Sequence, residues 1–275
     1  MKKTKKTNKT IVLLACLVAI THANVITTGG QNGVARTVSS YTLGKGSINA
    51  GVAVKGDYAY RDFYTNNGDN HESAWLLNED FFIGYGITNW LDISVNMPFY
   101  QDFWENHSGI IGAQGDLGVG IKLEHIGLYK YAPFRVGYLL RMTVPTGNDK
   151  AGYFQRHANH YKHFGTNTEG AYSSRGVSLN PTMVWTLDFN LFPIRLPLLL
   201  HGNLGGIANV SGAYKRQSAV LLGNLALEYQ FSNSWSSFIE LAGEAKAQAF
   251  SEGYNFTTNL NDNLLRLSGG ANFQA

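Results

Sequence analysis

Residues 115–124 read GDLGVGIKLE, and apolar and polar residues alternate along them with a period of two. One face carries the apolar residues Leu117, Val119, Ile121 and Leu123. The other face carries Asp116, Gly118, Gly120, Lys122 and Glu124. Because successive side chains of a β-strand point to opposite sides, this stretch predicts a strand with one apolar and one polar face. A single strand of this kind suits a soluble sandwich as well as a membrane barrel.

Nine further segments repeat the alternation, and their lengths and connections decide between these alternatives. We expect strands at about 47–59, 75–87, 90–100, 134–145, 177–189, 198–209, 218–231, 235–247 and 264–273. Their length of about ten residues is what a tilted strand needs to cross a bilayer. Counted along the chain with residues 115–124 as the fourth of ten segments, the odd-numbered segments are followed by long polar connections and the even-numbered segments by short ones. A soluble sandwich would explain the alternating residues but not this difference between the connections. The sequence predicts an all-β, antiparallel, up-and-down transmembrane β-barrel of about ten strands.

Composition agrees with this class. Aromatic residues make up 13% of the chain and charged residues only 15%, which is low for a water-exposed surface. After the first 25 residues there is no run of 18 or more apolar residues, which excludes a conventional membrane helix there. Several aromatic residues fall near predicted strand ends, as in the interfacial girdles of outer-membrane barrels.

The first residues have the three-part pattern of a secretory signal. Five lysines precede a short apolar run, 11–20, and the small-residue site Thr21-His22-Ala23 follows it. We therefore predict a signal peptide at 1–23, a poorly ordered periplasmic leader at 24–46 and the barrel at 47–275. Cys16 lies in the apolar run; its surroundings weakly resemble a lipoprotein processing site, but we interpret it as part of the signal because the run continues past it.

Cleavage of the signal changes the charge of the chain. Without the five lysines the formal net charge falls from +3 to −2. The basic character of the chain thus belongs to its targeting segment, and no nucleic-acid partner is expected. The mature chain has no cysteine and so no disulfide or cysteine metal site.

The alternation also assigns the side chains that line the lumen. The charged and histidine candidates are Lys55, Asp57, Asp80, Asp92, Asp116, Lys122, Glu124, Arg135, Arg141, Asp188, His201, Glu228, Glu240, Glu244, Lys246 and Arg266. Both signs occur, which suits either a wet pore or a narrow interior filled by ion pairs, such as Lys122 or Glu124 with Arg135 or Arg141. The two arginines suit the steering of an anionic solute as well, although we favour their pairing with carboxylates of 115–124.

The long polar segment 147–176 contains the weak candidates for a metal or catalytic site. His157, His160 and His163 are spaced to bind a transition metal if their rings converge, but we favour a solvated loop. Asp149, His157 and Ser173 suggest a catalytic set whose geometry nothing in the sequence fixes. We expect no enzymatic activity and no cofactor.

The quoted stretch, with YGITNWLDISVNMPFY at 85–100 and MTVPTGND at 142–149, resembles a family of outer-membrane transporters. The family is typified by meta-pathway phenol-degradation channels, and the barrel domains that precede OmpA-type peptidoglycan-binding domains are similar. The resemblance covers about 41–275 and implies passive passage of small, often hydrophobic molecules, with no catalytic residue. It also implies about twelve strands, so the alternative to ten strands is a barrel that lacks its last hairpin.

These observations together predict an outer-membrane channel for small solutes, hydrophobic ones included. Its loops are expected outside the cell and its termini in the periplasm. Outer-membrane lipid and the barrel-assembly machinery are the expected partners. The alternative function is a non-conducting structural or surface-binding barrel whose lumen is closed by its own ion pairs.

Overall fold

The computed structural model describes residues 27–273, apart from 28, 66–67, 105–109, 126–131, 150, 153, 155, 161–171, 212–218, 233–234 and 247–263. The predicted signal peptide, 1–23, lies outside the described residues, and so does His163. No helix within the described part is long and apolar enough to cross a membrane.

Ten long strands follow the order of the predicted segments. They are β3 (Ile48–Thr65), β4 (Gly68–Gly86), β5 (Leu91–Trp104), β7 (Leu117–Glu124), β8 (Phe134–Val144), β9 (Ser178–Asp188), β10 (Leu198–Asn209), β11 (Val220–Gln230), β12 (Trp235–Lys246) and β13 (Leu264–Phe273). The short elements are β1 (Gly33–Val34), β2 (Thr37–Val38), β6 (Ile110–Gln114) and the 3-10 turn η1 (Phe189–Leu191).

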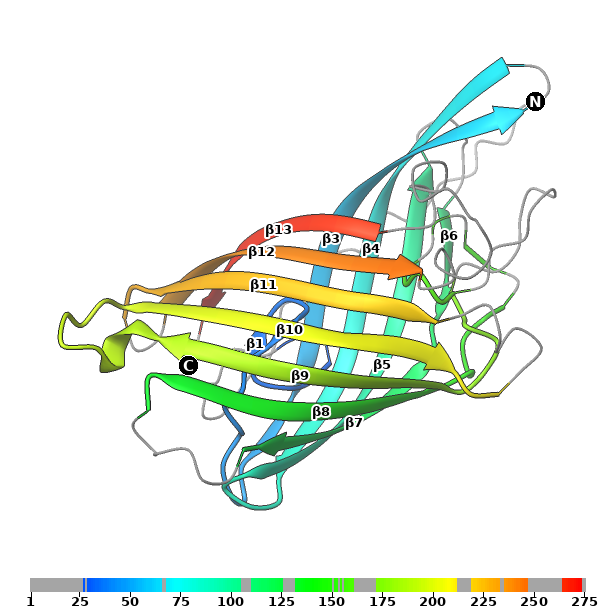
Figure 1. Ribbon diagram of the computed structural model, residues 1–275. Coiled ribbons are helices and arrows are strands. Elements are labelled where there is room, and N and C mark those ends of the chain that lie inside the picture. Colours follow the sequence, from blue (N-terminus) through cyan, green and yellow to red (C-terminus); the bar gives the residue numbers. More distant parts are fainter. Residues whose placement is uncertain are drawn as a thin grey trace, which may run out of the picture.

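The long strands form one antiparallel sheet in which each pairs with its neighbour in chain order, from β3 to β13. The short β6 adds to β5 next to the residues that pair with β7. The sheet curves strongly, and β1 lies within its curve (Figure 1). The predicted fold class, an all-β antiparallel barrel with an up-and-down order of about ten strands, is confirmed.

Apolar side chains cover the outer face of the sheet. In β7, Ile121 is 44% exposed and Leu123 is 39% exposed, whereas Lys122 between them is fully buried. Leu225 of β11 is likewise exposed, and its neighbour Ala226 is buried. Buried apolar side chains of the described residues form small clusters, such as Val38 with Leu139 and Val184. The sheet therefore presents its apolar face outward and encloses a polar interior.

Two parts of the sheet differ from the sequence prediction. The polar segment 61–73, which we expected to be a loop, continues the ladder of β3 and β4 until Thr65 pairs with Gly68. Polar composition does not prevent this pairing because backbone groups form the ladder. The strand β6 was not predicted, since its five residues lack a clear alternation.

The two end strands of the sheet, β3 and β13, both approach one side chain of the N-terminal segment. The guanidinium of Arg36 donates to Asp57 of β3 at 2.9 Å and to Ser268 of β13 at 3.5 Å. In the described residues β3 and β13 form no ladder with each other. The N-terminal segment thus connects the two ends of the sheet from inside.

Candidate functional site

The candidate site is the polar interior of the barrel. Of the predicted lumen residues, the buried ones are Asp80, Asp92, Asp116, Lys122, His201, Glu228, Glu240 and Glu244. Those that are half-buried are Lys55, Asp57, Glu124, Arg135, Arg141, Asp188 and Arg266. The side chain of Lys246 lies outside the described part of the chain. Many of these groups bind segments that precede or connect the strands, rather than only one another.

Residues 29–43, which we call the plug, occupy part of this interior. The expectation of a poorly ordered leader at 24–46 was wrong for these residues. Their strands β1 and β2 pair only with each other, and Val34 and Thr37 are fully buried. The plug is polar and has no apolar periodicity, so its order comes from contacts with the barrel wall and not from local propensity.

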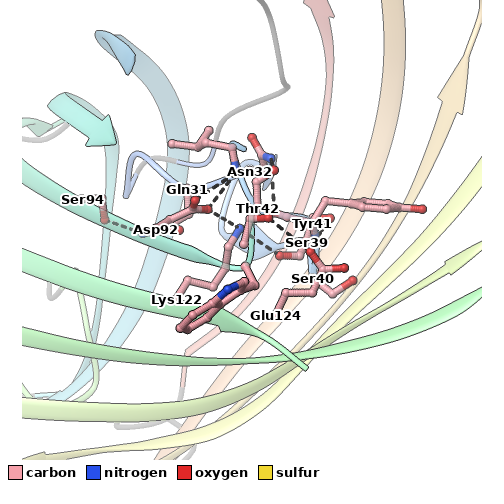
Figure 2. A network of polar contacts seen from close by, with 12 residues as sticks. Gln31, Asn32, Ser39, Ser40, Tyr41, Thr42, Asp92, Ser94, Lys122 and Glu124 are labelled. Carbon is pink, nitrogen blue, oxygen red and sulfur yellow. Dashed lines mark hydrogen bonds and ion pairs between the residues drawn. The ribbon is translucent and has the colours of Figure 1, made fainter. Parts of the chain in front are cut away.

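One end of the plug is held by a buried ion pair of β5 and β7 (Figure 2). Asp92 accepts bonds from the backbone N–H of Leu43 at 2.9 and 3.1 Å and lies 3.6 Å from the Nζ of Lys122. The same ammonium donates to the carbonyls of Ser39 and Tyr41. Both charged side chains are fully buried. Each therefore offsets the charge of the other, and both also bind the backbone of the plug.

The opposite wall holds the hairpin of the plug. One oxygen of Glu240 on β12 accepts bonds from the N–H groups of Arg36 and Thr37 at 2.8 and 2.6 Å, and from the Thr37 hydroxyl at 2.7 Å. The amide of Asn203 on β10 accepts from the N–H of Val38 and donates to its carbonyl. These side chains take the place of a neighbouring strand for the plug backbone.

A third set of contacts joins the plug to β8 and β9. The Tyr41 hydroxyl donates to Asp188 at 2.7 Å, and its ring lies under the guanidinium of Arg135 at 4.7 Å. Burial, followed by the bond to Asp188, raises the pKa of the Tyr41 phenol, so this hydroxyl remains a donor at ordinary pH. Arg135 also pairs with Glu124 at 2.6 Å, as the sequence predicted.

Thr186 and His201 extend these contacts inside the wall. The Thr186 hydroxyl accepts from the Ser40 N–H at 3.0 Å and lies 3.0 Å from the Nδ1 of His201. The other ring nitrogen of His201 lies 3.2 Å from Glu228. The order carboxylate, imidazole, hydroxyl is that of a hydrolase triad, but Thr186 is fully buried beneath the plug. We interpret the set as structural.

The plug backbone passes very close to the barrel wall. A Cβ added to Gly84 of β4 would lie 2.6 Å from the carbonyl oxygen of Gly30. A Cβ at Gly86 would overlap the carbonyl of Gly44, the residue that follows the plug. Glycine at these inward positions therefore makes room for the plug.

The connection between β8 and β9 closes the other part of the interior. Arg156 pairs with Asp102 of β5 at 2.5 Å and donates to Asn78 of β4 at 2.6 Å. Glu244 of β12 accepts from the Ala158 N–H at 2.7 Å and lies 2.9 Å from His157. The solvated loop expected at 147–176 was thus wrong for these residues, which fold inward onto the wall.

A second part of the same connection binds β7. Asp116 accepts from the N–H and hydroxyl of Ser174 at 2.8 and 2.9 Å and from the Gly147 N–H at 3.0 Å. We call the described parts of this connection, 154, 156–160 and 172–176, the cap.

Asp102 and Arg156 were missed as site residues, although the alternation of β5 continued past residue 100 would place Asp102 inward.

The weak metal and catalytic candidates do not assemble within the described residues. The rings of His157 and His160 are 5.0 Å apart, and His157 is bonded to Glu244. No group of three or more metal-binding side chains occurs in the described part. Asp149 pairs with Arg175 at 3.3 Å, and the Ser173 hydroxyl accepts from the Arg175 N–H.

A cavity of about 120 Å³ with both polar and apolar walls remains between plug and cap. It is large enough for several water-sized groups, at roughly 10–15 Å³ each. Plug, cap and strands all contribute to its walls, which include Gly29, Arg36, Lys55, Asn78, Asp80, Asn96, Tyr100, Arg141, Arg156, His157, Asn180, Thr182, Asn203, Asn224 and Glu244. The plug and the cap therefore lie on two sides of a small space in the interior.

Comparison with known proteins adds no assignment to this geometry: neither a family model nor a curated protein matches the chain.

Proposed function

We propose that the protein is an outer-membrane β-barrel that admits small polar solutes when its plug moves. The observation that carries this proposal is the way the lumen is closed. A barrel closed permanently can fill its interior with side chains of its own strands. Here a separate segment occupies part of the interior, and β1 and β2 share no ladder with the barrel. The plug can therefore leave the lumen without breaking any ladder between strands of the barrel.

The exterior supports the membrane part of the proposal. Apolar side chains such as Ile83, Leu140 and Leu225 are exposed at alternate positions, as on the lipid face of a barrel. Large aromatic residues near strand ends, Trp90 at 41% and Trp235 at 52%, are exposed as well. A water-facing band of this extent is unusual for a monomeric soluble protein.

Arginine at Leu225 tests the membrane part. Leu225 is 47% exposed within β11, and arginine near the midplane of a lipid face costs roughly 2–4 kcal/mol of folding free energy. On a soluble surface the same change stays within about 0.5 kcal/mol. We expect Leu225→Arg to lower the unfolding free energy in phospholipid vesicles by the larger amount, measured by denaturant titration.

Leu196→Arg is the matched control for that change. Leu196 is 43% exposed and lies in the connection between β9 and β10, which joins two neighbouring strand ends. Near the interface the cost of arginine falls to about 0–1 kcal/mol. Equal, small effects at both positions would contradict the membrane proposal.

Single-channel recording tests solute passage. We expect the refolded chain without residues 1–23 to stay closed in a planar bilayer for most of the time, with brief openings when the plug leaves. A continuously open pore would be inconsistent with the plug as a closure. A folded barrel that never opens would favour the alternative, a non-conducting barrel, which the buried pairs Asp92–Lys122 and Asp102–Arg156 also suit.

A further inference from the structure

The two inward arginines of β8 have different surroundings. Arg135 forms an ion pair with Glu124 and stacks on Tyr41. Arg141 donates to the side-chain oxygen of Asn96 at 3.1 Å and forms no ion pair within the described part of the chain. A guanidinium has five N–H donors, and the bond to Asn96 is the one hydrogen bond of Arg141 within the described residues.

A glycine of the plug makes the space that the Arg141 guanidinium occupies. In the register of the sheet Arg141 lies opposite Gly120 of β7. A Cβ at Gly29 of the plug would overlap the guanidinium itself. The plug thus leaves room for this cation at the boundary of the cavity.

The carboxylates around the cavity already have donors. Asp116 accepts three bonds from Ser174 and Gly147, and Glu244 binds His157 and Ala158. Asp80 accepts from the amide of Asn96 at 3.3 Å, so that Asn96 lies between Asp80 and Arg141. The Arg141 guanidinium has one hydrogen bond from its five N–H donors within the described residues, so it has donors left for a solute.

A second cation contributes to the same wall. Lys55 of β3 lines the cavity, and its Nζ is 3.9 Å from Asp57, which is bound more closely by Arg36 at 2.9 Å. The charged groups that line the cavity are four cations, Arg36, Lys55, Arg141 and Arg156, and three carboxylates, Asp80, Asp116 and Glu244, so one positive charge is in excess. The addition of a single negative charge would neutralise this wall.

We propose that the cavity binds small monocarboxylate anions, with the carboxylate of the solute bidentate on Arg141. A planar guanidinium matches a carboxylate with two parallel bonds, which a point charge cannot do. The amides and hydroxyls of Asn96, Asn180 and Thr182 supply further polar contacts. This inference rests on the proposed function, because it names the class of solute that the barrel admits.

Ligand-observed NMR with three probes tests the proposal on the refolded chain in detergent micelles. Butyrate and butyramide share a shape and differ in charge, and butylammonium carries a positive charge on a chain of the same four carbon atoms. We expect butyrate to bind at least tenfold more tightly than the other two. Arg141→Gln should weaken butyrate binding tenfold or more, while Arg141→Lys, which keeps the charge but not the planar fork, should lie between the two.

Arg195→Gln is the control, since it removes an exposed arginine of the connection between β9 and β10 that does not line the cavity. It should leave butyrate binding within twofold of the parent. Equal binding of butyrate and butyramide, or unchanged binding in Arg141→Gln, would overturn the proposal. Circular dichroism and the heat-dependent electrophoretic shift of a folded barrel verify each variant.

Binding and conduction can fail separately. Charge-selective butyrate binding by a barrel that never opens in a bilayer would reject the proposed function and keep the anion site. Openings without charge-selective binding would keep the channel and reject the anion site.

Discussion

Deletion of the plug, residues 29–43, is expected to convert a mostly closed barrel into one that conducts continuously. The plug binds the wall through polar groups such as Glu240 and Asn203, not through a shared ladder. When it is absent these groups face a water-filled lumen, where their hydration replaces the lost bonds. Planar-bilayer recording should show persistent current, with the heat-dependent electrophoretic shift retained.

A substitution in the wall gives the same test without shortening the chain. Gly84→Val places a side chain where the carbonyl of Gly30 lies, while its strand backbone accepts valine. It should raise the open fraction and increase hydrogen exchange of the plug amides. Gly223→Val is the control, because Gly223 lies within β11 and a Cβ there has no atom within 4 Å. Silent, folded barrels from both the deletion and Gly84→Val would reject gating by the plug.

The strands of the barrel were predictable because each carries its own signal. The alternation along a strand indicates which face meets the apolar surroundings. A shift of the strand register by one residue would turn every side chain to the opposite face. In β7, Ile121 is exposed and Lys122 is buried, as the quoted stretch indicated. The ion pair of Arg135 with Glu124 was predictable for the same reason, since both belong to inward positions of adjacent strands.

The plug was not predictable in this way because its order depends largely on contacts with the barrel wall. Residues such as Ser39 and Ser40 have no periodic neighbours, and the groups that bind them lie on β7 and β9. Two indirect signals existed. Glycines at the inward positions Gly84 and Gly120 indicate close approach of another segment. Inward charges also exceed what neighbouring strands can pair, as Glu240 illustrates by binding plug backbone.

The inward position of the cap could not be predicted from the sequence for the same reason. Its polar residues suit a solvated loop, and only contacts with Asp102 and Glu244 fold it inward. The distinction between Arg135 and Arg141 likewise required the structure. Both alternate inward on β8, but Arg141 lines the cavity, with room left by Gly29 of the plug and a bond to Asn96.

Lys122→Met should release the plug from the barrel wall rather than unfold the barrel. Lys122 is fully buried and bonds both to Asp92 and to plug carbonyls, so its loss leaves a buried carboxylate without its cation. Breaking one partner of a buried pair costs roughly 3–5 kcal/mol. If the plug undocks, water hydrates Asp92 and relieves most of this cost.

The cost should therefore appear in the docking equilibrium of the plug. A change of about 3 kcal/mol corresponds to a shift of roughly a hundredfold, since 1.4 kcal/mol is about tenfold. We expect the open fraction in bilayers to rise accordingly, with faster hydrogen exchange confined to residues 29–43. The double variant Asp92→Asn with Lys122→Met removes both charges and should return towards the closed parent. If Lys122→Met instead lowers the denaturation midpoint of the whole barrel while the current stays closed, Asp92 and Lys122 hold the wall together and the plug is not a gate.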